Sequence, residues 1–197
     1  MRTCRRLLST TLIVAVMLAA TGSATAARLS LNEQPFQATW ARLRMGDVSG
    51  LTTAWVECPV TLEGSFHSAT LAKVARSLVG LVTRANLGTC TNGSATLLIE
   101  RLPWHLRYRS FSGTLPRISA VGLALEGLAA RISVGITCLF ITEGEQVELS
   151  LRLEAAGTVT GARLEGFGSA GVCGPVGVRG EPGSFRGVTR SLVITLI

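Results

Sequence analysis

The chain is poor in the residues from which most catalytic, metal and nucleic-acid sites are built. It has two histidines, one tyrosine and a single lysine, Lys73, and charged residues make up 16% of its 197 positions. No two cysteines are spaced as C-x-x-C and neither histidine is close to them in sequence, so we predict no metal site. The remaining basic residues are scattered arginines, a composition typical of a high-GC genome, and we predict no nucleic-acid partner.

Long apolar runs are also scarce, and the clearest one lies at the N-terminus. Met1–Arg6 is basic, Leu7–Ala20 is almost wholly apolar, and Ala24–Ala26 offers small residues for cleavage. This apolar core is short for a membrane span, so we interpret residues 1–26 as a Sec-type signal peptide. We expect the mature chain, 27–197, to be secreted or envelope-associated, without a transmembrane segment. Removing the leader takes three arginines and lowers the formal net charge from +7 to +4.

Four cysteines remain in the mature chain, and an even number in an exported protein indicates two disulfides. Three pairings are open. We favour Cys58–Cys90 and Cys138–Cys173, because their loops would have similar lengths. In the chain-entropy model each bond would contribute about 3–4 kcal/mol. The length of the mature chain suits one domain with its own core, so we predict a single disulfide-stapled β-rich domain over 27–197.

Alternation of apolar and polar residues dominates this domain. Within Leu102–Pro116, apolar side chains alternate with basic ones, the pattern of a strand with one buried and one wet face. Val147–Glu154 alternates more strictly, and Ile118–Glu126 with Ala129–Ile136 is expected to form a hairpin around Gly127. We therefore predict a mainly-β fold, an antiparallel β-sandwich or β-barrel of about eight to eleven short strands. The sequence leaves sandwich and barrel open.

One segment, Ser68–Ala85, has helical periodicity instead. Its apolar residues recur at steps of three and four, at Leu71, Val74, Ala75, Leu78, Val82 and Ala85. Ser68 is placed to cap the first turn, and Asn86 and Gly88 supply a stop. We predict one α-helix here, covering a face of the sheet or plugging one end.

Gly166–Gly183 is rich in glycine and contains one motif of interest. Residues 166–171 match the dinucleotide-binding pattern G-x-G-x-x-G. A phosphate-binding loop must open a helix, and here Val172-Cys173-Gly174-Pro175 follows instead. We interpret the motif as a glycine-rich loop and expect no cofactor, and we leave open that part of the segment, around Val172–Val178, is extended.

The central strand supplies the candidate binding residues, which are Trp104, His105, Arg107, Tyr108 and Arg109. Alternate residues on a strand lie roughly 7 Å apart on one face, so His105, Arg107 and Arg109 would form a basic row. Such a row favours an anionic ligand. The alternative is a solvated face that is balanced by acids on a neighbouring strand, such as Glu100 or Glu148.

Two longer segments, Cys58–Val74 and Leu102–Ile118, together with Cys138 and Cys173, resemble a family of secreted proteins from high-GC actinobacteria. That family has no assigned activity, so the resemblance implies an exported β-rich domain and transfers no catalytic residue. We predict a non-enzymatic binding or structural module of the cell envelope or exterior. Two alternatives stay open: a barrel that binds a small apolar ligand, and a secreted hydrolase that uses His105 or His67.

Overall fold

The computed structural model confirms the mainly-β prediction. The residues that it describes are 28–47, 55–114, 117–142, 147–169 and 175–197. They form fourteen strands and one short 3₁₀ helix, η2 (Ile99–Arg101). No helix within these ranges is long and apolar enough to cross a membrane. The predicted signal peptide and Cys173 lie outside the described residues.

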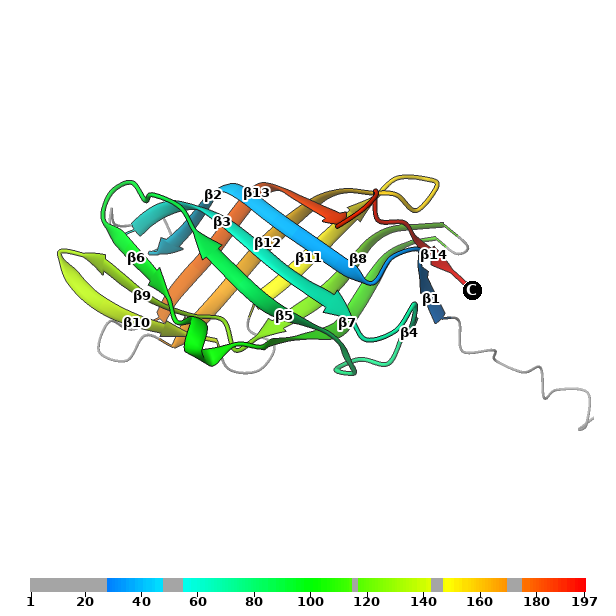
Figure 1. The fold of residues 1–197 in the computed structure, drawn as a ribbon, viewed down its shortest axis with the longest axis horizontal. Coiled ribbons are helices and arrows are strands. Elements are labelled where there is room, and N and C mark those ends of the chain that lie inside the picture. The colour runs from blue at the N-terminus through cyan, green and yellow to red at the C-terminus, as the bar shows by residue number, and fades with distance from the viewer. Residues whose placement is uncertain (1–27, 48–54, 115–116, 143–146, 170–174) are drawn as a thin grey trace, which may run out of the picture.

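Eight of the strands close into an antiparallel barrel (Figure 1). Each of the eight pairs with the barrel strand that follows it in the sequence, so that β11 pairs with both β8 and β12. The last, β13, pairs with the first, β2, and this pairing closes the barrel. The barrel alternative is therefore the observed one. Its strands are β2 (Pro35–Gly46), β3 (Trp55–Phe66), β5 (Leu78–Leu87), β7 (Trp104–Thr114), β8 (Arg117–Glu126), β11 (Val147–Leu153), β12 (Val159–Ser169) and β13 (Pro175–Gly187).

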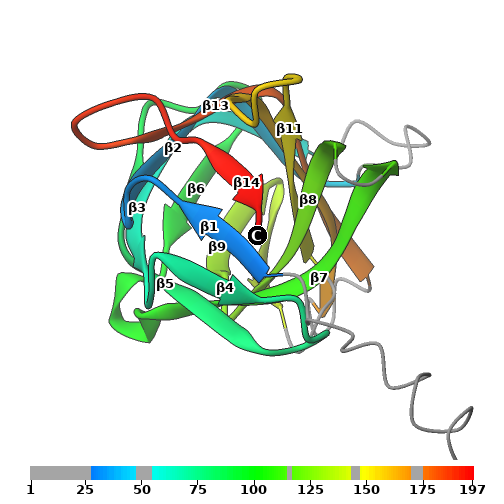
Figure 2. The same cartoon turned by 90° about the vertical axis from the view of Figure 1, so that its right-hand side faces the viewer.

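A separate three-stranded sheet lies across one end of the barrel (Figure 2). It consists of β1 (Arg28–Leu31), β4 (Thr70–Ala72) and β14 (Ile194–Leu196), with β1 in the middle. Leu29 and Ile194 on this sheet are almost fully buried and belong to the same hydrophobic cluster as the barrel interior. This cap joins the two ends of the described chain.

The other end of the barrel continues into a smaller set of strands, β6 (Ser94–Leu97), β9 (Ala129–Val134) and β10 (Ile136–Ile141). β9 pairs with β6 and β10, and β10 joins the barrel at β12. Phe140 on β10 is fully buried and reaches the inner face of β12 at Gly168.

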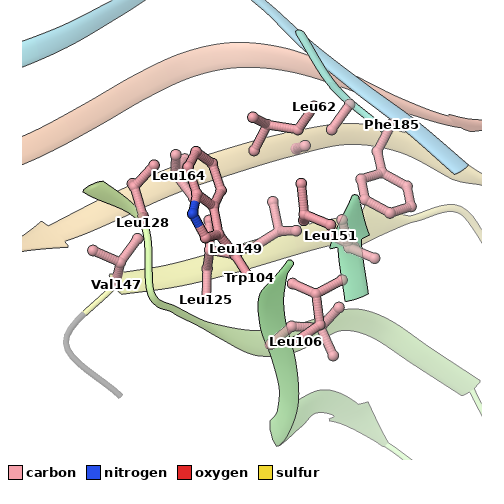
Figure 3. Packing of buried hydrophobic residues seen from close by; sticks show 14 of the residues in the cluster. Leu62, Trp104, Leu106, Leu125, Leu128, Val147, Leu149, Leu151, Leu164 and Phe185 are labelled. Atoms are coloured by element: carbon pink, nitrogen blue, oxygen red, sulfur yellow. The ribbon is translucent and has the colours of Figure 1, made fainter. Parts of the chain in front are cut away.

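Large side chains occupy the barrel interior. An eight-stranded barrel has an interior just wide enough for side chains to fill or for one small ligand. Here Trp40 and Trp104 are both fully buried, and Trp104 lies among leucines from several strands (Figure 3). Glycines on β13 make room for Trp40, since a Cβ at Gly180 or Gly183 would lie within 2.8 Å of its Cδ1.

The predicted helix at Ser68–Ala85 is wrong. The segment forms β4, a turn and β5. Ser68 does accept a hydrogen bond from the Thr70 amide, at 3.1 Å, but the turn leads into a strand. Along β5 a register shift opposite Glu63 and Gly64 leaves Thr83 unpaired, so Val82 and Ala85 both point inward. A β-bulge thus produced a three-residue spacing that resembles a helix.

Two other local expectations need correction. β8 and β9 do not form a hairpin around Gly127, because β8 pairs with β7 and β11, while β9 turns at Gly135 and pairs with β10. The glycine-rich segment is mostly strand, since β12 extends to Ser169 and β13 begins at Pro175. Its inward glycines serve close packing against Phe140 and Trp40.

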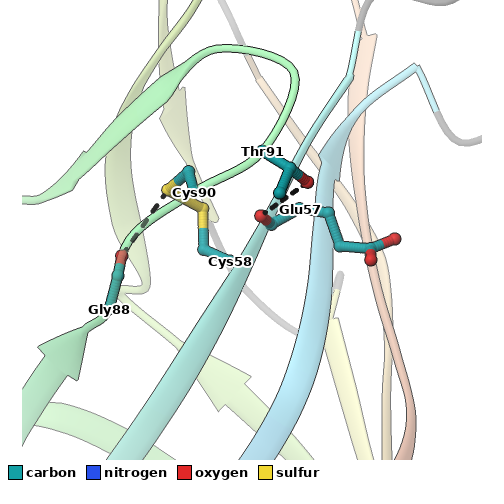
Figure 4. The surroundings of a disulfide bond; sticks show 5 residues. All are labelled: Glu57, Cys58, Gly88, Cys90 and Thr91. Atoms are coloured by element: carbon teal, nitrogen blue, oxygen red, sulfur yellow. Dashed lines mark hydrogen bonds between the residues drawn. A yellow bond between two sulfur atoms is a disulfide. The ribbon is translucent and has the colours of Figure 1, made fainter.

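The predicted disulfide Cys58–Cys90 is present, with the two Cα atoms 4.2 Å apart (Figure 4). It lies in a short ladder that fastens the segment after β5 to β3. The amides of Glu57 and Thr91 each donate to the other residue's carbonyl, at 3.2 and 2.8 Å. Cys138 is also disulfide-bonded, and the partner that we predicted for it, Cys173, lies outside the described residues.

Candidate binding site

The five candidate residues of β7 divide between the two faces of the barrel wall. Trp104 and Tyr108 point into the barrel and belong to the hydrophobic core. Burial raises the pKa of the Tyr108 phenol. His105, Arg107 and Arg109 lie on the outer face, where only Arg107 is partly buried. The basic row therefore exists on the outer surface, and the two aromatic residues are part of the interior.

Acids from neighbouring strands contact both arginines of this row. Arg107 Nε donates to Glu126 Oε2 at 2.7 Å, and its Nη1 donates to the Arg76 carbonyl at 3.0 Å. Arg109 Nη1 lies 3.4 Å from Glu148 Oε2. The His105 side chain is exposed and makes no hydrogen bond or ion pair with any described residue. The positive charge of the row is thus largely neutralised. Glu126 and Glu148 are the acids responsible; of the two that we named from the sequence, Glu148 takes part and Glu100 does not.

Small residues lie on the outer face of β8 between this row and β11. These residues are Ala120, Gly122 and Ala124. A Cβ at Gly122 would lie 2.7 Å from Ser110 Oγ and 2.9 Å from Glu148 Oε1. Glycine therefore lets side chains from β7 and β11 converge across β8, and this convergence positions Glu148 against Arg109.

Two open hollows meet on this wall. The smaller has a volume of about 370 Å³ and is lined by Arg109, Glu148, Ser150, Arg163, Glu165, Gly166 and Phe167. The larger has a volume of about 830 Å³ and is lined by Ala120, Ser150, Arg152, Leu153, Glu154, Thr160–Arg163, Pro182 and Gly183. Ser150 and Arg163 line both, so the two hollows adjoin at these side chains, and we call the pair the outer groove. Of the sequence candidates, Arg109 is the one that lines it.

The electrostatics of the groove depend on two facing acids. Glu148 on β11 and Glu165 on β12 are directly opposite partners in the sheet, an arrangement that is unfavourable for like charges alone. Arg109 lies against Glu148, and Arg163 forms an ion pair with Glu165. All four side chains are between 37% and 46% exposed, so a ligand can reach them.

Phe167 lies on the outer face of β12, two residues after Glu165, and is 58% exposed. It lines the smaller hollow next to the two ion pairs. The sequence interpretation missed it by assigning Gly166 onward to a loop. The available signal was the alternation of Arg163, Glu165 and Phe167 with Leu164 and Gly166.

A third hollow, of about 520 Å³, lies on another part of the outer wall, between β13, β2, β3 and β5. Its polar groups are bonded to one another. Gln37 donates to Glu63 at 3.0 Å and accepts from Arg186 at 2.7 Å, and Arg84 also bonds Glu63. It has no exposed aromatic residue, so the outer groove is the stronger candidate.

Comparisons with known proteins do not assign the chain. No family model, no curated protein and no solved structure matches it. Within the described ranges, no group of three or more His, Cys, Asp or Glu side chains is arranged to hold a metal ion. The functional argument therefore rests on the geometry of the outer groove.

Proposed function

We propose that this chain is an exported, non-enzymatic binding module of the cell envelope or exterior that holds its ligand in the outer groove. The observation that carries the proposal is the contrast between the two sides of the barrel wall. Trp40 and Trp104 occupy the interior, whereas the outer wall has two adjoining, accessible hollows lined by charged side chains and by Phe167. A ligand that binds to the outer wall uses the surface that the folded barrel leaves accessible.

Export is supported by the disulfide and by the placement of the cap. The Cys58–Cys90 bond suits an oxidising compartment. The cap strand β1 begins at Arg28, so cleavage before residue 27 would leave the cap sheet complete. Expression of the full chain in a bacterial export host, followed by N-terminal sequencing of the exported product, tests this part. We expect Ala27 as the first residue, and a product that retains residues 1–26 would contradict it.

A binding role is supported by the surroundings of the groups that a hydrolase would use. The side chains of His67 and His105 make no hydrogen bond or ion pair with a carboxylate or hydroxyl within the described residues. In the groove, Glu148 and Glu165 are each paired with an arginine. The apolar-ligand barrel and the hydrolase stay predictions, but no specific contact favours either.

The test measures how much protein is retained on insoluble cell-envelope material, and compares the wild type with a variant whose groove is filled. Ser150→Trp places an indole at the position that both hollows share. Thr61→Trp is the matched control, because Thr61 faces outward on β3, four strands from β11 in either direction around the barrel. Purified, oxidised protein would be sedimented with insoluble envelope material, and the bound fraction measured.

We expect the wild type and Thr61→Trp to be retained and Ser150→Trp to be released. Equal retention of all three proteins would contradict binding through the groove, as would no retention of the wild type. Release of soluble fragments from the material by the wild type would contradict the non-enzymatic part. Circular dichroism of each variant confirms that the barrel is folded.

A further inference from the structure

The charge of the outer groove points to an uncharged ligand. Three arginines and three glutamates line it: Arg109, Arg152, Arg163, Glu148, Glu154 and Glu165. A polyanion such as nucleic acid would meet as many repelling groups as attracting ones, and the same holds for a polycation. A neutral ligand can instead accept hydrogen bonds from guanidinium groups and donate them to carboxylates.

The closed sheet beneath the groove disfavours an extended peptide. Peptides that bind to sheets usually add a strand at a free edge, where the main chain supplies the affinity. Here β8 is paired with β7 and β11, β11 with β8 and β12, and β12 with β11 and β13. No main-chain edge is available under the groove, so recognition must come from side chains. A ligand rich in hydroxyl groups meets that requirement without a strand edge.

The groove also offers an aromatic platform beside its hydrogen-bonding groups. Phe167 is more than half exposed at the smaller hollow, next to the Arg163–Glu165 pair. An aromatic face packs well against the C–H face of a sugar ring, while the flanking charged groups reach the equatorial hydroxyls. The combination of a flat apolar face and planar polar groups is suited to a pyranose.

We infer that the outer groove binds a neutral, extended oligosaccharide chain, with one sugar ring stacked on Phe167 and its neighbours following the groove past Ser150. Because the groove consists of two adjoining hollows, of about 370 and 830 Å³, a chain of several sugar units can occupy both. This inference rests on the proposed function and names its class of ligand.

Affinity electrophoresis tests the inference, with soluble neutral glucans, mannans and galactans cast singly into native gels. Phe167→Leu keeps an apolar side chain but removes the ring, and Phe167→Tyr keeps the ring. Ile136→Ala is the control, because Ile136 is an exposed apolar residue on β10, away from the groove lining. At least one neutral polysaccharide should retard the wild type. Phe167→Leu should weaken that binding by about tenfold, while Phe167→Tyr and Ile136→Ala stay within about threefold.

The outcomes separate the ligand class from the use of the groove. Retardation that Ser150→Trp abolishes and Phe167→Leu weakens supports the inference. If no neutral polysaccharide retards the wild type, but Ser150→Trp still lowers retention on envelope material, the ligand class is wrong and the groove function stands. If an anionic polymer or a peptide competes for the groove instead, the inference is overturned in the same way. Retardation that Ser150→Trp leaves unchanged overturns both proposals.

Discussion

Gly183→Ala tests whether the barrel interior is as closely filled as the structure indicates. Gly183 on β13 is the direct partner of Trp40 on β2, and both face inward. A Cβ at Gly183 would lie 2.5 Å from Trp40 Cδ1 and 2.8 Å from the Ala162 carbonyl oxygen. Neither neighbour is the free end of a flexible side chain, because the indole is fully buried and the oxygen belongs to β12.

The expected loss in the free energy of unfolding of Gly183→Ala follows from overpacking of the barrel interior. Forcing one additional carbon into a filled core costs about 1–3 kcal/mol. For a domain of this size that corresponds to a fall in Tm of roughly 2–12 °C. The backbone at Gly183 is not in the left-handed region, so the cost arises from steric overlap and not from strain.

A double-mutant cycle, measured by urea unfolding, isolates the contact between residue 183 and the Trp40 indole. The indole nitrogen of Trp40 has no hydrogen-bond partner among the described residues, so Trp40→Phe loses volume without breaking a hydrogen bond to any of them. In that background Gly183→Ala should cost less than in the wild type, by about 1 kcal/mol or more. Gly161→Ala is the control, since its Cβ would meet only the Gly183 carbonyl oxygen at 3.6 Å. A neutral Gly183→Ala, or purely additive costs, would refute a tightly filled interior.

Three further changes probe other parts of the fold. Cys58→Ala with Cys90→Ala opens a loop with a sequence separation of 32, and urea unfolding should show a loss of about 3–4 kcal/mol, whereas a loss under 1 kcal/mol would contradict the chain-entropy account. Arg107→Gln breaks a partly buried 2.7 Å ion pair and should cost about 1 kcal/mol in the same assay, so an unchanged midpoint would count against it. Glu33→Gln should destabilise the protein at neutral pH and progressively less as the pH falls below about 4, whereas the exposed Glu100→Gln should show no such trend.

The pH trend at Glu33 follows from its hydrogen bonds. The Thr189 amide, which donates to Glu33 Oε1 at 2.9 Å, lowers the pKa of the carboxyl, aided by the Thr189 hydroxyl and by the amide and charge of Arg190, against opposing desolvation. Because the folded pKa lies below the unfolded one, the stabilisation is present above the unfolded pKa. It is lost as the pH falls through the folded pKa. A stability difference that grows on acidification would contradict this assignment.

Much of the strand content could be predicted from local alternation, as on β7 and β11. Closure of the barrel could not, because it depends on pairings between distant segments, such as β13 with β2. The helix predicted at Ser68–Ala85 was wrong because the register shift in β5 interrupts the alternation of inward and outward residues along that strand. Gly80 was the signal against a helix, since glycine is unfavourable inside one. In the structure a Cβ there would lie 2.8 Å from the Ser65 carbonyl oxygen on the neighbouring strand.

The candidate site was predictable only in part. Arg109 and its acidic partner Glu148 were both recognisable as outward residues, because each belongs to a sequence segment in which apolar and polar residues alternate. Their contact was not, since β8 lies between their strands, and strand order is needed to place Gly122 between them. Phe167 was missed because the glycines around it, of which Gly168 makes room for Phe140 inside the barrel, resemble those of a loop.

Nuclear magnetic resonance mapping of a neutral oligosaccharide onto the labelled protein tests the central claim most directly. The indole N–H signals of Trp40 and Trp104 report on the interior, and the amides of Ser150, Arg163 and Phe167 report on the outer groove. We predict shifts of the groove amides with both indole signals unchanged. Shifts of the indole signals without the groove amides would place the ligand inside the barrel and contradict the account.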